Sequence, residues 1–188
     1  LEPNTVFFAR PPQDLPTEDT THEIQEQGAR LLADAGYYQY EVSAFARDGE
    51  VCRHNLNYWL FGDYLAAGAG AHGKLTTEDG IGRYRKPANP QQYMNAMEAG
   101  GADFALSPVP GNELLFEFML NALRLSDGFD EGLFAERTGL DTRQLEDAMR
   151  PALEKALVAR GAESRWRPTE LGRRFLNDLQ ASFLPGGG

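Results

Sequence analysis

The spacing of apolar positions along the 188-residue chain changes beyond its midpoint. Before residue 107, short helical patterns alternate with aromatic and β-branched stretches that are typical of strands. After residue 111 the apolar positions recur every three or four residues, which is the period of a helix. The segment SPVPG at 107–111 carries two prolines between these regions. It predicts a boundary between one domain over residues 1–106 and a second over residues 111–188.

The N-terminal region predicts a helix followed by a strand. In the helix, expected over residues 20–35, Thr20 and Glu23 have the spacing of a capping box, and Gly36 suits the end. The aromatic stretch that follows predicts a strand over residues 37–43. Helix and strand form one α/β unit, so the predicted fold class is α/β. Beyond this unit, the sequence NPQQYMNAMEAGG predicts a second short helix that begins after Asn89.

The C-terminal region predicts three helices, an extended wing and a last helix. The second helix ends at Gly139, the third begins at Asp141 and ends before Gly161, and Thr169 caps the last helix. The apolar face of the first helix consists of Leu114, Leu115, Phe118, Met119, Ala122 and Leu123. This order of elements is the outline of a small helical, winged-helix-like domain.

A winged-helix outline raises the hypothesis of an interaction or DNA-binding module, and the charges argue against DNA. A helix that reads the major groove is basic, whereas the predicted third helix is charge-balanced. Its charged residues are Arg143, Arg150, Lys155, Arg160, Asp141, Glu146, Asp147 and Glu154. The whole chain has a formal net charge of −10 and repels a phosphate backbone. We therefore expect no nucleic-acid partner.

The stretch HNLNYW, which begins at His54, concentrates polar and half-polar side chains that need partners when they are buried. The His54 imidazole can ligate a transition metal or haem iron, with Asn55 or Asn57 holding its other nitrogen. Tyr58 and Trp59 offer flat faces for a planar ligand. A purely structural histidine is the alternative, and the residues alone leave both open.

Two neighbouring features are weaker. Cys52 precedes His54 by two residues, so on an extended strand both side chains would point to one face. Structural zinc needs four ligands and the sequence has no second pair of this kind, so we expect no zinc site. The glycine-rich segment 66–76 lacks the full dinucleotide-binding fingerprint and is more typical of a packed strand end than of a ligand cradle.

Four segments, in order, resemble one family: LEPNT, YYQYEVSAFAR, CRHNLNYWLFGDYLAAGAGAHGKLT and the helical tail. They resemble the C-terminal half of the oxygen-independent coproporphyrinogen III oxidase-like radical SAM proteins, nearest to the haem-chaperone branch. The most specific parts are H-N-x-x-Y-W from His54 and G-x-G-A-H-G from Gly68. True coproporphyrinogen oxidases lack the hexapeptide and carry a serine-containing sequence at the second motif. Oxidative decarboxylation of coproporphyrinogen is therefore the alternative function.

The resemblance implies roles for individual residues. His54 would be the axial ligand of haem iron, and so the metal ligand of this chain. Asn55, Tyr58 and Trp59 would shape the haem-binding pocket.

A second set of residues is expected, by the same resemblance, near the adenosyl cofactor. The glycine segment would lie at the last strand of the barrel, so Ala71 and His72 are candidates for contact with S-adenosylmethionine. Leu1 and Glu2, at another barrel strand end, are further candidates.

The resemblance also implies an architecture and a role for the full-length protein. We expect the C-terminal part of a partial (β/α) radical SAM barrel, followed by the winged-helix-like domain. The protein would bind haem and transfer it to haem-accepting haemoproteins, and peripheral contact with membrane-bound acceptors is compatible with that role. No apolar run approaches the roughly 20 residues of a membrane span, so we expect a cytoplasmic location. The oligomeric state is left undetermined.

The family's 4Fe-4S cluster is held by a C-x-x-x-C-x-x-C motif, whereas this sequence has one cysteine, Cys52. Its opening, LEPNTVFFAR, resembles a strand that has just ended in a Pro-Asn turn. We therefore expect the chain to be a fragment of a longer polypeptide and inactive alone. The cluster and S-adenosylmethionine would belong to the full-length protein only.

Overall fold

The computed structural model describes residue 3, residues 5–100 and residues 105–186. The N-terminal elements are two helices and a hairpin: α1 (Val6–Ala9), α2 (Glu18–Asp34), β1 (Tyr38–Glu41) and β2 (Ala44–Ala46). The N-cap of α2 is Thr17, whose hydroxyl oxygen accepts a hydrogen bond from the Thr20 N–H. The helix therefore begins three residues before the predicted capping box. Gly36 follows its end with φ +81°, as expected.

The stretch predicted as one strand over residues 37–43 is instead a tight antiparallel hairpin. β1 pairs with β2, and the chain reverses at Val42 and Ser43. The buried Glu41 carboxylate accepts a hydrogen bond from the Ser43 N–H at 3.1 Å and pairs with Arg124 at 3.2 Å. This distant ion pair holds the turn, and local periodicity cannot predict it.

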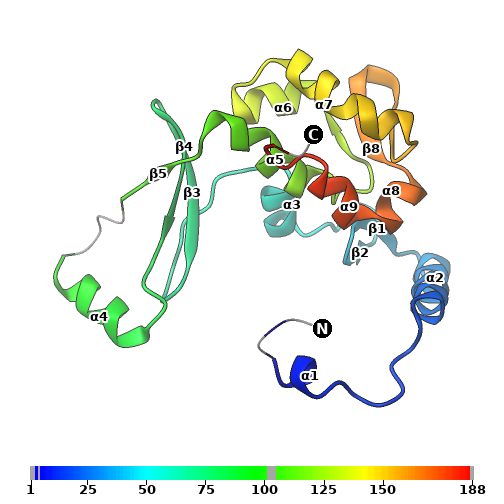
Figure 1. The fold of residues 1–188 in the computed structure, drawn as a ribbon, viewed down its shortest axis with the longest axis horizontal. Coiled ribbons are helices and arrows are strands. Elements are labelled where there is room, and N and C mark those ends of the chain that lie inside the picture. Colours follow the sequence, from blue (N-terminus) through cyan, green and yellow to red (C-terminus); the bar gives the residue numbers. More distant parts are fainter. Residues whose placement is uncertain (1–2, 4, 101–104, 187–188) are drawn as a thin grey trace.

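The middle of the chain contains a helix, a long hairpin, a second helix and a short strand: α3 (Arg53–Trp59), β3 (His72–Thr77), β4 (Gly80–Arg85), α4 (Pro90–Glu98) and β5 (Ser107–Pro108). The sheet order is β3-β4-β5, and Figure 1 shows α4 at one end of this hairpin. Asn89 caps α4 through its side-chain oxygen, as predicted. Every strand pair found in the described residues is antiparallel, so the parallel strands of a barrel are not among these pairs.

The C-terminal elements form helices around a three-stranded sheet: α5 (Gly111–Ala122), β6 (Phe129–Asp130), α6 (Glu131–Thr138), α7 (Thr142–Glu154), β7 (Val158–Arg160), a 3-10 turn (Ala162–Ser164), β8 (Arg165–Pro168), α8 (Glu170–Arg174) and α9 (Leu176–Ala181). The sheet order is β6-β8-β7. The predicted caps at Asp141 and Thr169 accept backbone hydrogen bonds, and Gly139 ends α6 with φ +72°.

Two predicted helix bounds are wrong. The third helix ends at Glu154 rather than before Gly161, because Ala156 adopts φ +53° and the chain then pairs as β7 with β8. The last helix is not continuous: it breaks at Phe175 into α8 and α9. The first difference arises where tertiary pairing overrides the local helical pattern.

Phe118 of α5 lies in the middle of the hydrophobic core. Its ring meets those of Phe61, Phe129 and Phe134 edge-on, with centroids 5.7, 5.0 and 5.2 Å away. Ile81 of β4 belongs to the same core. Residues on both sides of the predicted boundary thus share one core, and the division into two domains stays a prediction.

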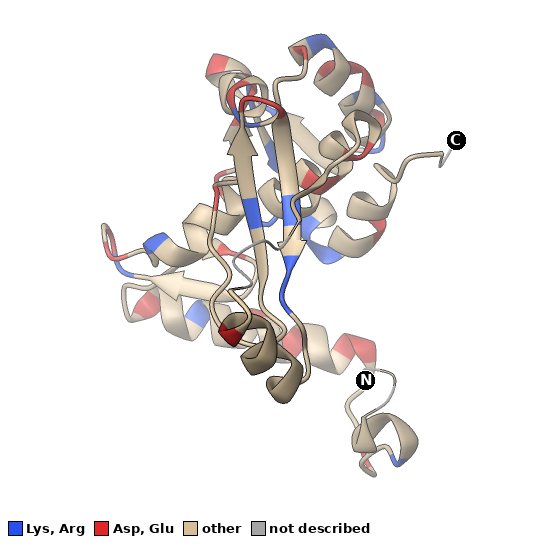
Figure 2. Ribbon diagram, turned by 90° about the vertical axis from the view of Figure 1, so that its left-hand side faces the viewer, with Lys and Arg blue, Asp and Glu red and all other residues tan. Residues whose placement is uncertain are grey.

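Acidic and basic positions are interspersed along the ribbon (Figure 2). On α7, Arg150 pairs with Asp147, and Glu146 binds Arg160 of β7 at 2.7 Å. These pairs fit the charge balance seen in the sequence, and the expectation of no nucleic-acid partner stays a prediction. Within the described ranges, no helix combines the length and apolar character needed to cross a membrane.

Candidate functional site

The HNLNYW stretch forms helix α3 rather than an extended segment. Cys52 is the N-cap of this helix, without a side-chain capping bond, and its thiol is exposed. On a helix, residues two apart do not share a face. The geometry in which Cys52 and His54 would point the same way is therefore wrong.

His54 and Tyr58 are one helical turn apart and in contact. Their rings meet edge-on, with centroids 5.0 Å apart and planes at 80°. His54 is exposed, and no hydrogen bond to its imidazole is found among the described residues. Behind Tyr58 lies Tyr64, whose ring centroid is 4.5 Å from that of Tyr58. The His54 imidazole is thus exposed, and the rings of Tyr58 and Tyr64 support it from the protein side.

The two asparagines do not hold the His54 ring. Asn55 donates from its side chain to the Tyr40 hydroxyl at 3.2 Å, which ties α3 to the β1–β2 hairpin. Asn57 donates to the Asp63 carbonyl at 2.8 Å, which ties the helix to the loop that follows it. The expected hydrogen bond from Asn55 or Asn57 to His54 is therefore absent from this structure, and both side chains position the helix instead.

Trp59 lies on a different side of α3 from the His54–Tyr58 pair. The Arg124 guanidinium covers its ring, 4.2 Å from the centroid, and is itself paired with Glu41. The Trp59 Nε1–H is buried, and no acceptor for it is found in the described part of the chain. At least one face of this indole is occupied by protein, so of the four predicted haem-pocket residues the structure brings together His54 and Tyr58.

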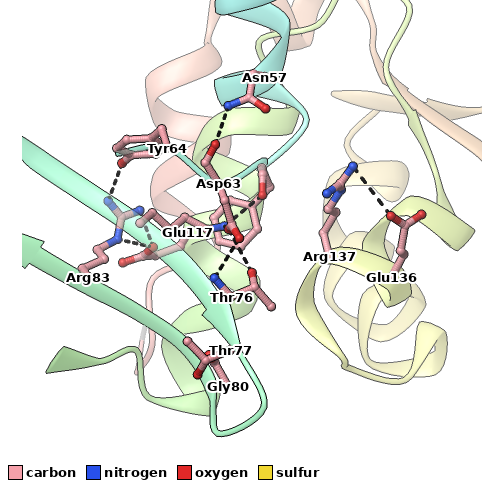
Figure 3. Close-up of polar contacts among 12 residues, drawn as sticks. Asn57, Asp63, Tyr64, Thr76, Thr77, Gly80, Arg83, Glu117, Glu136 and Arg137 are labelled. Atoms are coloured by element: carbon pink, nitrogen blue, oxygen red, sulfur yellow. Dashed lines mark hydrogen bonds and ion pairs between the residues drawn. The ribbon is translucent and has the colours of Figure 1, made fainter. Parts of the chain in front are cut away.

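A buried lysine holds the loop that follows α3. Lys74 of β3 is 1% exposed, and its Nζ donates to the Phe61 carbonyl and to Asp63 Oδ1, each at 3.0 Å. Asp63 also accepts from the Thr76 N–H at 2.8 Å and the Thr76 hydroxyl at 2.9 Å (Figure 3). Sequence reasoning missed this pair, because Lys74 lies within a glycine-rich segment with no local sign of burial.

Burial and hydrogen bonding oppose each other in this pair. Burial lowers the pKa of Lys74 below its ordinary value, against the raising effect of Asp63. Burial would raise the pKa of Asp63, but the hydrogen bonds from Thr76 and Lys74 outweigh it and leave that pKa below its ordinary value.

A second ion pair connects the sheet to α5. Arg83 of β4 donates to Glu117 Oε2 from Nε at 2.8 Å and from Nη2 at 2.5 Å, and to the Tyr64 hydroxyl from Nη1 at 3.2 Å. Burial alone would lower the pKa of Arg83, whereas the hydrogen bond and charge of Glu117 raise it above its ordinary value. Figure 3 shows this guanidinium between the phenol and the carboxylate.

Comparisons with known proteins identify relatives of this chain. Residues 109–175 match the family described as the HemN C-terminal domain. The chain is 43% identical over 185 residues to the heme chaperone HemW of Haemophilus influenzae, covering 98% of this chain and 47% of that protein. It is also 43% identical over 189 residues to the HemW of Escherichia coli, with the same two coverages. The chain belongs to the HemW-like family.

A solved structure supports the fold of this HemW-like chain. Coproporphyrinogen III oxidase (HemN) from Escherichia coli, titled a radical SAM enzyme, superposes with a TM-score of 0.61 at 17% identity. The match covers 90% of this chain and 42% of that one. At this identity the likeness concerns the fold alone, and it supports an α/β chain that corresponds to part of a HemN-like protein. The HemW-like chain spans about half the length of the curated relatives it matches.

Two of the residues predicted to lie near an adenosyl cofactor, Ala71 and His72, are found at the start of the β3–β4 hairpin. His72 begins β3, is exposed and pairs in register with Arg85. The Ala71 carbonyl accepts a hydrogen bond from the Lys86 N–H at 2.9 Å. His72 thus begins a strand of an antiparallel hairpin, and Ala71 directly precedes it, whereas the last strand of a parallel barrel was expected. Leu1 and Glu2 lie outside the described residues.

The donors present in this HemW-like chain do not fit an iron–sulfur cluster. A cubane cluster is held by cysteine thiolates, and the chain has the single thiol of Cys52. No group of three or more His, Cys, Asp and Glu side chains suited to a metal ion occurs within the described ranges.

Proposed function

We propose that this chain is the haem-binding C-terminal part of a haem chaperone, and that His54 is the axial ligand of the haem iron. The observation that carries the proposal is the exposed His54 imidazole supported edge-on by Tyr58. A neutral imidazole nitrogen is a good ligand for haem iron, and the motif H-N-x-x-Y-W is the part of the sequence that resembles the chaperone branch. The curated relatives are named as heme chaperones.

The residues of α3 would have different roles in binding haem. His54 would bind the iron, and Tyr58 would limit rotation of the imidazole and offer an apolar edge to the porphyrin. Asn55 and Trp59 would not contact haem and would instead fix the position of α3, through Tyr40 and Arg124 respectively. An exposed ligand on a rigid helix suits a protein that must release its cargo, because haem can leave without unfolding its site.

The full-length protein would transfer haem to haem-accepting haemoproteins, and membrane-bound acceptors would be contacted peripherally. We infer a cytoplasmic location, a partial (β/α) radical SAM barrel that includes residues 1–106, and a winged-helix-like domain over residues 111–188. The 4Fe-4S cluster and S-adenosylmethionine would belong to the part of the protein that this chain lacks. In that longer protein Ala71, His72, Leu1 and Glu2 stay candidates for contact with the adenosyl cofactor.

Replacement of His54 tests the proposal. We expect His54→Ala to lose the Soret signature of axial ligation and to bind haem at least about tenfold more weakly, with residual apolar binding. His72→Ala is the matched control, since it removes an exposed imidazole outside α3, and it should leave the haem spectrum intact. Thermal melting curves would establish that both variants fold. An unchanged Soret position and affinity in folded His54→Ala would mean that the ligand lies elsewhere.

A further inference from the structure

A small cavity lies beside the rings of Tyr58 and Tyr64, which support His54. It has a volume of about 160 Å³ and lies between α3 with its following loop, the β3–β4 hairpin and α5. Its lining includes Tyr58, Tyr64, Lys74, Arg83 and Asn121. A water molecule takes about 30 Å³, so the cavity has room for a short polar arm of a ligand and not for a porphyrin ring.

The charged residues that line this cavity are both cations. The carboxylates that neutralise them, Asp63 and Glu117, are not among the lining residues. Lys74 lies deep, bound to Asp63, whereas the Arg83 side chain is 37% exposed and so is the reachable cation. A group in the cavity therefore borders two cations, each already paired with a carboxylate that is not among the lining residues.

The cavity also has hydrogen-bond donors to spare. A guanidinium has five N–H groups, and within the described part of the chain Arg83 uses three of them on Glu117 and Tyr64, which leaves two. Since the Tyr64 hydroxyl accepts one of those bonds, its own proton is left for another acceptor. Asn121 donates one of its two amide hydrogens to the Glu117 carbonyl and retains the other. A site with surplus donors and two cations suits an acceptor-only anion, of which a carboxylate is the natural example.

Tyr58 connects this cavity to the proposed iron ligand. One neighbour of its ring is the His54 imidazole, at 5.0 Å between centroids, and the other is Tyr64, at 4.5 Å. A planar ligand bound to His54 would thus have its edge beside Tyr58, and an arm from that edge could reach past the phenol to Arg83. Haem carries two such arms, each ending in a carboxylate.

We propose that this cavity binds a carboxylate arm of the haem presented to His54, with Arg83 and the Tyr64 hydroxyl as its donors. The proposal rests on the function proposed above and adds a second anchor to it. The iron bond would hold the ring at one point, and the carboxylate would set its rotation about that bond. Lys74 would contribute positive charge from its buried position while it remains bound to Asp63.

The test compares haem with its dimethyl ester, in which both carboxylates are neutral. The wild-type chain should bind haem about tenfold more tightly than the ester, since a charge-assisted pair is lost. In the double variant R83Q/E117Q the two amides can still bond to each other. The ratio of the affinity for haem to the affinity for the ester should fall close to one. The matched control is Arg85→Gln on the same strand, which lies outside the cavity lining and should keep the tenfold preference.

Two results would overturn the proposal: no preference for the acid in the wild type, or a preference that persists in R83Q/E117Q. If thermal melting shows that the double variant does not fold, Tyr64→Phe removes one donor and keeps the ion pair. It should reduce the preference by about threefold or more, because the charged carboxylate loses one hydrogen-bond donor, and an unreduced preference would again overturn the proposal.

Metal-free protoporphyrin IX and its dimethyl ester separate this proposal from the function on which it rests. Neither needs an iron ligand, so quenching of porphyrin fluorescence reports the cavity alone. If His54→Ala leaves the haem spectrum unchanged while the acid preference depends on Arg83, the iron ligand is wrong and the cavity is right. If His54→Ala loses axial ligation and the wild type binds the acid and the ester equally well, the iron ligand is right and the carboxylate site is wrong.

Discussion

At the residue scale, the side chains around α3 depend on paired charges that the chain partly buries. Lys74 binds Asp63 beneath the loop that follows the helix, and Arg83 binds Glu117 beside it. Removal of one partner from such a pair leaves an uncompensated charge, which costs more than the intact pair contributes. Loss of one partner from either pair would therefore weaken the contacts next to α3.

The lowered pKa of Asp63 predicts how stability changes in acid. Because that pKa lies below its ordinary value of 3.8 in the folded state, the stability it contributes is present above pH 3.8. That stability is lost as the pH falls from 3.8 through the lowered pKa, since the unfolded chain takes up the proton first. Chemical denaturation at a series of pH values should show this loss in the wild type and its absence in Asp63→Asn.

The matched control for this experiment is Asp79→Asn, an exposed carboxylate on the turn between β3 and β4. It should preserve the wild-type profile. Asp63→Asn should also be less stable at neutral pH, because Lys74 loses its charged partner. Parallel profiles of the wild type and Asp63→Asn below pH 3.8 would contradict the assignment.

At the element scale, the end of α3 is where the site is most sensitive to backbone changes. The chain leaves the helix through Phe61, which adopts φ +56°, and the Gly62 N–H bonds to the Asn57 carbonyl at 2.7 Å. A Cβ on Gly62 would collide with the Asn57 side chain and lie 2.8 Å from the Asn57 carbonyl oxygen. Glycine is needed here for close approach rather than for a left-handed conformation.

Gly62→Ala should therefore destabilise the chain by about 1–3 kcal/mol and weaken haem binding, because α3 must shift to relieve the overlap. Gly28→Ala is the matched control: Gly28 lies within α2, and a Cβ there meets nothing within 4 Å. That variant should be more stable by about 0.5–1 kcal/mol, as expected for alanine in a helix interior. Urea denaturation measures both, and equal stabilities of the two variants would contradict this account of Gly62.

At the scale of the whole molecule, apolar exposure is uneven. The large apolar side chains of α1 and α2 lie open, with Ile24 59% and Leu31 70% exposed, whereas those of α5 form the core. Ile24, Leu31 and Leu32 have the spacing of one helical face, and α2 nevertheless has no buried residue. The N-terminal region thus contributes little to the core, which is built from the middle and the C-terminal region of the chain.

The thiol content of the whole molecule predicts the result of cluster reconstitution. With Cys52 as its single cysteine, the chain should take up far less than stoichiometric iron and sulfide and should form no 5′-deoxyadenosine from S-adenosylmethionine. Cys52→Ser should behave like the wild type, since one exposed thiol cannot hold a cubane. Four irons and four sulfides per chain, or product formation in the wild type, would contradict the prediction.

Local chemistry determined much of this protein from its sequence. The caps at Asn89, Asp141 and Thr169 and the helix end at Gly139 need only residues within a few positions of each other. The apolar period placed the buried face of α5 correctly for the same reason. The hexapeptide that begins at His54 pointed to the HemW-like family, whose members match this chain over nearly its full length.

The tertiary structure decided what distant residues do to one another. The predicted strand over residues 37–43 is a hairpin with the Arg124–Glu41 pair at its turn, and residues 158–160, which were predicted as helix, form a strand that pairs with β8. Within the site, sequence reasoning named His54 and Tyr58, but the Asp63–Lys74 and Arg83–Glu117 pairs join residues 11 and 34 positions apart. Such contacts form only when separate elements pack against each other. The spacing of residues along the sequence therefore does not predict them.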